Sequence, residues 1–93
     1  FPGSVPVYRG NQLIGGLGVS GDGIDQDDMI SFLGLANANS RLGGGAPNNA
    51  PVDKRADQIV VQLAGGRSAR LIYINCPFTP FLDTDRQNVC QGL

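Results

Sequence analysis

Glycines and aspartates are concentrated between Gly15 and Asp28, and these are the residues best placed to do chemistry. Residues 16–21, GLGVSG, match the GxGxxG pattern of dinucleotide-binding loops. Such a loop needs its glycines at the turn that opens a helix, where backbone amides face the pyrophosphate. Here the first two glycines fall inside a predicted strand, and the next helix opens behind aspartates that would repel phosphate. The pattern therefore favours glycines that let a ligand or another element lie close to the strand.

Four aspartates, Asp22, Asp25, Asp27 and Asp28, carry the oxygen ligands that Ca²⁺ prefers. Their spacing is not that of an EF-hand loop, and the chain has no glutamate to end such a loop. Helix capping accounts for three of them. Asp25 is predicted to be the N-cap, with Asp28 completing a weak capping box, and Asp27 and Asp28 fall in the first turn, where carboxylates suit the helix dipole. We therefore predict no metal site.

The chain contains no histidine, which excludes Ser-His-Asp and Cys-His catalytic arrangements within it. Two cysteines alone fall short of a four-ligand zinc site, and there is no CxxCH haem-attachment motif. Tyr8, Met29, Tyr73 and the cysteines are the only side chains of types that could ligate a haem iron. Each is predicted to be a core or strand residue instead, and no catalytic residue is predicted.

The two cysteines, Cys76 and Cys90, are separated by a segment with two prolines and a polar turn. This spacing permits a disulfide, which would contribute about 3 kcal/mol in the chain-entropy model. The alternative is two unpaired thiols, one of them buried as a small hydrophobic residue. If the bridge forms, the compartment is oxidising, and the protein is expected to be exported or periplasmic.

The elements that position these residues begin with an antiparallel hairpin. Residues 5–8 and 13–20 are predicted strands, and Gly10-Asn11 is the centre of the turn between them. An apolar helix is then predicted from Asp25 to about Ala38, carrying Met29, Ile30, Phe32, Leu33 and Leu35.

The second half of the chain reads differently. Residues 39–53, which are rich in glycine, asparagine and proline, are predicted to be a flexible linker. Residues 58–63 and 69–76 are predicted to form a second hairpin, followed by an irregular tail to Leu93.

The bulk composition narrows the class of protein. Ninety-three residues make at most one small domain, and a core of this size often needs a partner or a covalent staple. A net charge of −1 disfavours nucleic-acid binding, and no apolar run is long enough for a membrane span. The chain begins with Phe1 rather than Met, so we expect it to be a processed or excised product.

The N-terminal third of the chain resembles the C-terminal half of the HbpS/GlcG-like haem-binding family, which also includes the C-terminal domain of PduO-type proteins. The matching pieces are residues 2–7 (PGSVPV), residues 14–21 (IGGLGVSG) and Asp27-Asp28. The resemblance implies a profilin-like sandwich in an often oligomeric protein that binds haem or a related tetrapyrrole. It also implies that Gly15, Gly16, Gly18, Ser20 and Gly21 form a possible pocket wall. The family's N-terminal helices and first strands are absent, so no haem ligand is assigned to any residue here.

These observations together predict an α+β chain. Residues 1–38 would form part of a profilin-like domain, an antiparallel sheet with a flanking helix, and residues 54–93 a β-hairpin extension of the kind found in larger bacterial exported proteins. The predicted function is non-catalytic binding of a small cofactor, with haem as the candidate. We expect pairing with a missing N-terminal segment or another protein chain. The alternatives are a structural or assembly module, or a subunit of a larger exported enzyme complex with its catalytic residues elsewhere.

Overall fold

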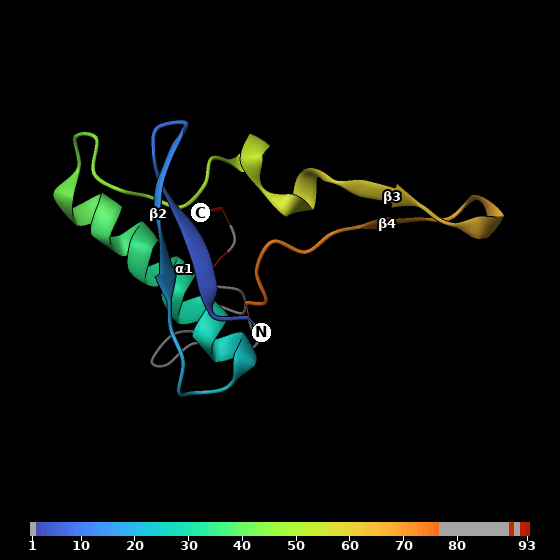
Figure 1. Cartoon of the computed structure of the whole chain (residues 1–93), viewed down its shortest axis with the longest axis horizontal. Coiled ribbons are helices and arrows are strands. Elements are labelled where there is room, and N and C mark those ends of the chain that lie inside the picture. Colours follow the sequence, from blue (N-terminus) through green and yellow to red (C-terminus); the bar gives the residue numbers. More distant parts are fainter. Residues whose placement is uncertain (1, 77–89, 91) are drawn as a thin grey trace.

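The computed structural model describes residues 2–76, 90, 92 and 93 (Figure 1). In this part of the chain one α-helix and two separate two-stranded antiparallel sheets form, so the α+β prediction is confirmed. The elements are β1 (Ser4–Arg9), β2 (Gln12–Gly18), α1 (Ile24–Leu42), β3 (Val60–Gln62) and β4 (Ser68–Arg70), with short 3₁₀ helices at Val52–Lys54, Ala56–Gln58 and Ala64–Gly66. No helix among these residues is long and apolar enough to cross a membrane.

The first hairpin forms where the sequence predicts it. β1 pairs with β2 from Ser4 opposite Gly18 to Arg9 opposite Gln12. Gly10 occupies the turn with a φ of 59°, which is the left-handed conformation that two-residue hairpin turns require. The register shifts by one residue after Val7, leaving Ile14 as an extra residue on β2.

The core of the molecule is small and lies between β1 and α1. Val5 on β1 packs with Phe32 and Leu35 on α1, and Phe32 is only 1% exposed. Val7 and Leu17 cover this cluster from the same face of the sheet. Helix periodicity explains the arrangement, because positions three and four apart share one face of a helix. The apolar residues of the hairpin thus bury only the side of the sheet that faces α1.

The ends of α1 differ from the prediction. The helix starts at Ile24, and Gly23, with a φ of 104°, occupies the N-cap without any side-chain cap. The prediction that Asp25 is the N-cap was wrong, because Asp25 already lies inside the first turn. At the other end the helix continues past Ala38 to Leu42 and stops at Gly43, whose φ is 63°.

The predicted linker takes part in the packed structure. Asn48 exchanges two backbone hydrogen bonds with Tyr8 along the outer edge of β1. Asn49 and Ala50 are buried, and the Asn49 side chain donates a hydrogen bond to the carbonyl of Phe32. The asparagines of this glycine-rich segment therefore satisfy backbone groups of the first unit.

The second hairpin projects from the body as an arm (Figure 1). Each of its strands has three residues, fewer than predicted, and all six are exposed. The chain's radius of gyration is 14.5 Å, against about 12 Å for a compact domain of this length.

The predicted strand at residues 69–76 ends at Arg70, because the chain then turns back to the core. Tyr73 and Ile74 pack against the core cluster, and the backbone amide of Asn75 donates to Asp28. The predicted irregular tail lies mostly outside the described residues.

Candidate functional site

The predicted pocket wall lies around the turn that connects β2 to α1. A cavity of about 530 Å³ opens here, and Gly18, Ser20 and Gly21 line it. Gly15 and Gly16 lie further back on β2, outside the cavity lining. Three of the five predicted residues are therefore brought together at one opening, which we call the glycine-turn pocket.

The backbone donors of this turn are already occupied. The carboxylate of Asp27 accepts hydrogen bonds from the amides of Asp22, at 3.0 Å, and Gly21, at 3.3 Å. These are amides of the kind that a phosphate-binding loop would present to its ligand. Because an internal carboxylate holds them, the turn disfavours an anionic ligand.

The glycines of β2 leave space around the strand. A methyl group placed on Gly15 or Gly18 would meet no other atom within 4 Å. On Gly16 it would only reach the carbonyl oxygen of Val5, at 4.0 Å. Packing among the described residues therefore does not account for the absence of side chains at these positions.

Within the part of the chain that the structure describes, no strand pairs with the edge of β2 that faces away from β1. Val19 donates to the carbonyl of Gly3, which continues the ladder between the two strands. Backbone amides alternate in direction along a strand, so the amides of Gly16 and Gly18 point away from β1. Among the described residues, none forms a backbone hydrogen bond to residues 12–18 outside the hairpin. β2 thus presents unpaired donors and acceptors where its side chains are smallest.

The structure separates the roles of the aspartates in the first helical turn. Asp27→Ala is expected to lower the free energy of unfolding by about 1–2 kcal/mol, because the amides of Gly21 and Asp22 lose their acceptor. Asp25→Ala is expected to leave the urea midpoint nearly unchanged, since Asp25 forms no side-chain cap. Urea denaturation of both variants checks this, and a larger loss for Asp25→Ala would contradict it.

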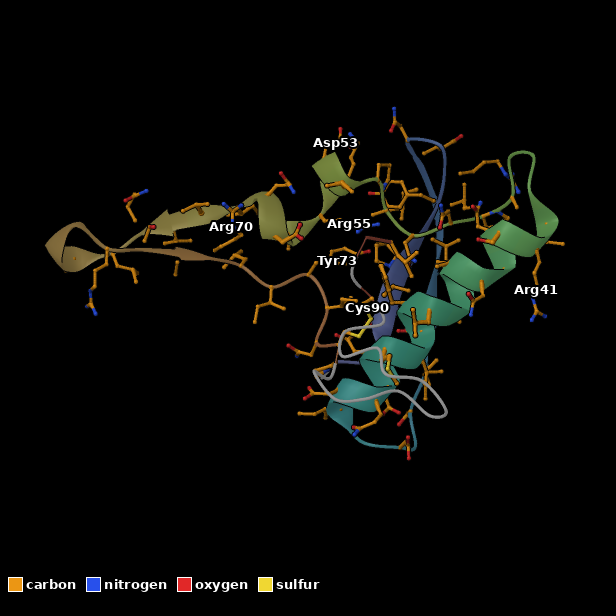
Figure 2. All side chains as sticks on the ribbon, turned by 180° about the vertical axis from the view of Figure 1, so that it is seen from behind. Arg41, Asp53, Arg55, Arg70, Tyr73 and Cys90 are labelled. Atoms are coloured by element: carbon orange, nitrogen blue, oxygen red, sulfur yellow. A yellow bond between two sulfur atoms is a disulfide. The ribbon has the colours of Figure 1, made fainter. Side chains whose placement is uncertain are left out.

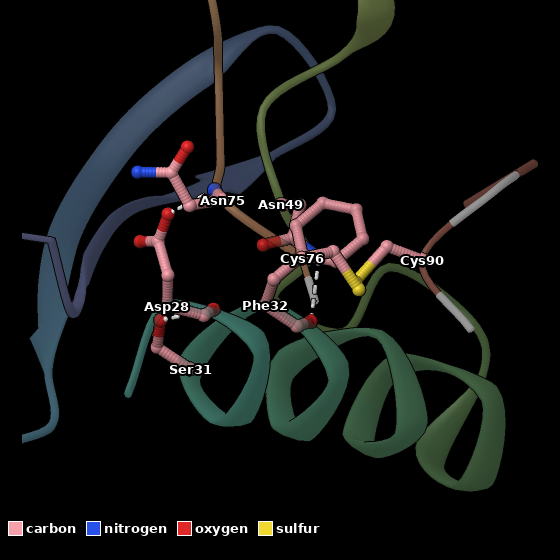
Figure 3. Close-up of a disulfide and its surroundings, with 7 residues drawn as sticks. All are labelled: Asp28, Ser31, Phe32, Asn49, Asn75, Cys76 and Cys90. Atoms are coloured by element: carbon pink, nitrogen blue, oxygen red, sulfur yellow. Dashed lines mark hydrogen bonds between the residues drawn. A yellow bond between two sulfur atoms is a disulfide. The ribbon is translucent and has the colours of Figure 1, made fainter. Parts of the chain in front are cut away.

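Asp28 is the polar centre of the body. It is 4% exposed, and it lies beside the core cluster on α1 (Figure 3). One carboxylate oxygen accepts from the amide of Gly3, at 3.1 Å, and the other accepts from the amide of Asn75. Asp28 therefore ties the start of the hairpin and the segment returning from the arm to the same helix.

The predicted disulfide between Cys76 and Cys90 is present. The two Cα atoms are 6.2 Å apart, within the range that a disulfide can span. The bridge lies beside the ring of Phe32 (Figure 3). It anchors Cys90 to the end of the segment that Asp28 holds.

A second cavity, also of about 530 Å³, lies at the base of the arm beside this disulfide. Its most distinctive side chain is Arg55 (Figure 2). The guanidinium carbon of Arg55 lies 5.3 Å from the ring centre of Phe32 and 5.2 Å from that of Tyr73. The two rings meet edge to face at 6.2 Å. These distances allow favourable cation–π contacts with both rings, which fix the position of the guanidinium.

Burial raises the pKa of the Tyr73 hydroxyl above its ordinary value, more than Arg55 and the nearby backbone of Ala50 lower it. The Tyr73 hydroxyl is buried and forms no hydrogen bond with any described residue. Because folding raises this pKa, its contribution to stability is complete below the pKa of an unfolded tyrosine, about 10, and is lost as the pH rises through the folded value.

We therefore expect the urea midpoint to fall above about pH 10, and the fall to be smaller in Tyr73→Phe. If the urea midpoint falls equally in wild type and Tyr73→Phe, this pH dependence does not come from Tyr73.

The glycine-turn pocket does not fit haem held by this chain alone. Its described lining contains no histidine, cysteine, methionine or tyrosine, the side chains that ligate haem iron. Both cysteines are used in the disulfide. No group of three potential metal-ligating side chains occurs among residues 2–76, 90, 92 and 93.

Sequence reasoning missed the two roles that depend on distant contacts. Asp28 looked like part of a capping box, and Arg55 was not singled out. The sequence does contain a signal for Asp28: it lies four residues before Phe32 and therefore on the same, apolar face of the helix. No local pattern marks Arg55, because the two aromatic rings that it contacts belong to distant parts of the chain: Phe32 lies on α1 and Tyr73 on the segment after β4.

Comparison with known proteins identifies no relative: no family model, no curated protein and no solved structure matches the chain.

Proposed function

We propose that this chain is a non-catalytic binding and assembly module, and that a partner segment completes its first sheet along the free edge of β2. The observation that carries the proposal is that edge, with the amides of Gly16 and Gly18 directed outward. Beside it, Leu13 is 59% exposed and Ile14 is 42% exposed. A two-stranded sheet is marginal in water, and an added strand would cover these side chains.

A profilin-like domain is the arrangement that the resemblance suggests for the completed sheet. A hairpin packed on one long helix is the part that this chain would contribute to it. The remaining strands would come from a missing N-terminal segment or from another protein chain. The exposed apolar residues of the arm support the same view, because an isolated two-stranded hairpin needs a covering surface.

The glycine-turn pocket is the proposed place for a small cofactor, lined by Gly18, Ser20 and Gly21 and approached along Gly15 and Gly16. Haem or a related tetrapyrrole is the candidate from the resemblance, with the iron ligand supplied by the partner. Titration with haemin, followed by visible absorption, tests this part: a shifted Soret band in the assembled protein supports it, and an unchanged spectrum favours a purely structural module. The disulfide supports an exported location.

Residue-resolved amide exchange tests the edge directly. In the unassembled chain the amides of Gly15 and Leu17, which face β1, should exchange more slowly than those of Gly16 and Gly18. In the assembled protein Gly16 and Gly18 should become protected. If they still exchange freely there, the partner does not use this edge.

Gly18→Val separates folding from assembly. The structure leaves space for the added side chain, and valine favours a strand, so the variant should fold at least as well as wild type. A bulky side chain at the edge should weaken association with the partner by about tenfold or more, because it obstructs close approach. Sedimentation measurements check this. Gln12→Val, at the exposed other end of β2, is the control and should associate normally.

A further inference from the structure

One face of the arm is apolar and remains exposed in the described part of the chain. Backbone hydrogen bonds join Leu71 to Ile59 and Leu63 to Arg67 at the two ends of the hairpin. Residues that lie directly opposite each other share a face, and side chains alternate along each strand, so the odd-numbered residues all lie on one side. This side carries four large apolar residues that are 42–52% exposed: Ile59, Val61, Leu63 and Leu71.

The outer edge of β4 has the same spacing of unpaired backbone groups as the edge of β2. Because the odd-numbered residues of the arm bond across the hairpin, the amides and carbonyls of Ser68 and Arg70 point away from β3. On β2 the outward groups are those of Gly16 and Gly18. An antiparallel alignment places Ser68 opposite Gly18 and Arg70 opposite Gly16. Hydrogen bonds can then form at both pairs.

This register also gives the arm the right orientation relative to α1. Ala69 would lie opposite Leu17, whose side chain packs against the core cluster. Leu71 would lie opposite Gly15, where the absence of a side chain leaves space. The apolar face of the arm would therefore continue the side of the first sheet that faces α1, where its side chains would be shielded from water.

The charges at the two edges complement each other in the same alignment. Arg67 would lie just beyond the end of β2, where the chain turns towards α1. Asp22 and Asp25 are exposed at that turn. The only hydrogen bond from the Arg67 side chain goes to the carbonyl of Ala64, at 3.4 Å, and no ion pair forms between it and another described residue. A basic arm tip would thus meet an acidic turn.

We propose that the segment completing the first sheet is the arm of a second copy of this chain, exchanged reciprocally in a twofold dimer. This rests on the proposed function, for which it names the partner. Asn48 pairs with the edge of β1 away from β2, so the arm leaves the body on the far side of the sheet from its own β2 edge (Figure 1). Each completed sheet would have the strand order β1-β2-β4-β3, with the last two strands from the other copy.

Charge reversal on separate chains tests the exchange. Arg67→Glu makes the arm tip acidic, and the double variant Asp22→Lys, Asp25→Lys makes the turn before α1 basic. Each alone should dimerise about tenfold more weakly than wild type in sedimentation equilibrium, because like charges meet twice in a twofold dimer. An equimolar mixture should dimerise nearly as well as wild type, because opposite charges meet at both contacts. Arg41→Glu, at the exposed end of α1, has the same net charge as Arg67→Glu and should dimerise like wild type (Figure 2).

The mixture keeps the test decisive if either variant alone does not fold, since pairing would restore both. A mixture that dimerises no better than its components would overturn the exchange, as would normal dimerisation of Arg67→Glu or a wild-type chain that remains monomeric. Amide exchange separates this failure from failure of the proposed function. Protection of Gly16 and Gly18 in a complex with a different chain would overturn only the exchange, whereas free exchange of both in every assembly would overturn both proposals.

Discussion

Asp28→Asn is expected to lower the free energy of unfolding by about 3 kcal/mol, because the buried carboxylate accepts from two amides that are far apart in the sequence. Asparagine keeps the shape but places an NH₂ group where one oxygen accepted a hydrogen bond. One of the amides of Gly3 and Asn75 would then face another donor, in a region that is closed to water.

Urea denaturation at one fixed protein concentration measures this loss, since association also contributes to stability. Asp53→Asn removes an exposed carboxylate from a 3₁₀ helix and is the control that should leave the midpoint in place. An Asp28→Asn variant with the wild-type midpoint would show that Asp28 does not hold the two segments.

Removing the disulfide is expected to have a comparable effect. The double variant Cys76→Ser, Cys90→Ser should lose about 3 kcal/mol, because the bridge closes a loop of about fifteen residues and restricts the unfolded chain. The region around Phe32 should be destabilised most, because the bridge lies beside its ring (Figure 3) and lines the second cavity.

Thiol counting under denaturing, non-reducing conditions checks the bridge itself. No free thiol is expected in the native protein, and two free thiols would contradict the bridge. One free thiol would point to a link between chains.

The parts of the fold that could be predicted depend on local chemistry. Gly10-Asn11 sets its hairpin turn through the backbone freedom of glycine. The disulfide could be proposed because only two cysteines exist and prolines separate them. In each case the residue types themselves indicate the structure, without knowledge of distant contacts.

The parts that were missed depend on contacts across the chain. The start of α1 was misplaced because Gly23 takes the N-cap position, while Asp27 reaches back to the preceding turn. Asp28 bonds residues that are 25 and 47 positions away, and no local pattern reports such partners. The second hairpin is shorter than predicted because the chain turns away after Arg70, and Tyr73 packs against Phe32.

Of the residues that the structure describes, only four apolar side chains are buried, Val5, Phe32, Leu35 and Ala50, whereas many large apolar side chains are exposed on β2 and the arm. A core of this size is marginal for an independent domain. The disulfide and the Asp28 contacts tie the described segments together, but neither covers the free edge of β2. An added strand would do so, which is why assembly is central to the proposed function.

Urea unfolding of the 93-residue chain over a hundredfold range of protein concentration tests most directly whether this chain needs a partner. If folding requires assembly, the chain will either show no cooperative transition or show a midpoint that rises with concentration, since association stabilises only the folded state. A single cooperative transition with a midpoint independent of concentration, in a chain that sediments as a monomer, would contradict the proposed assembly.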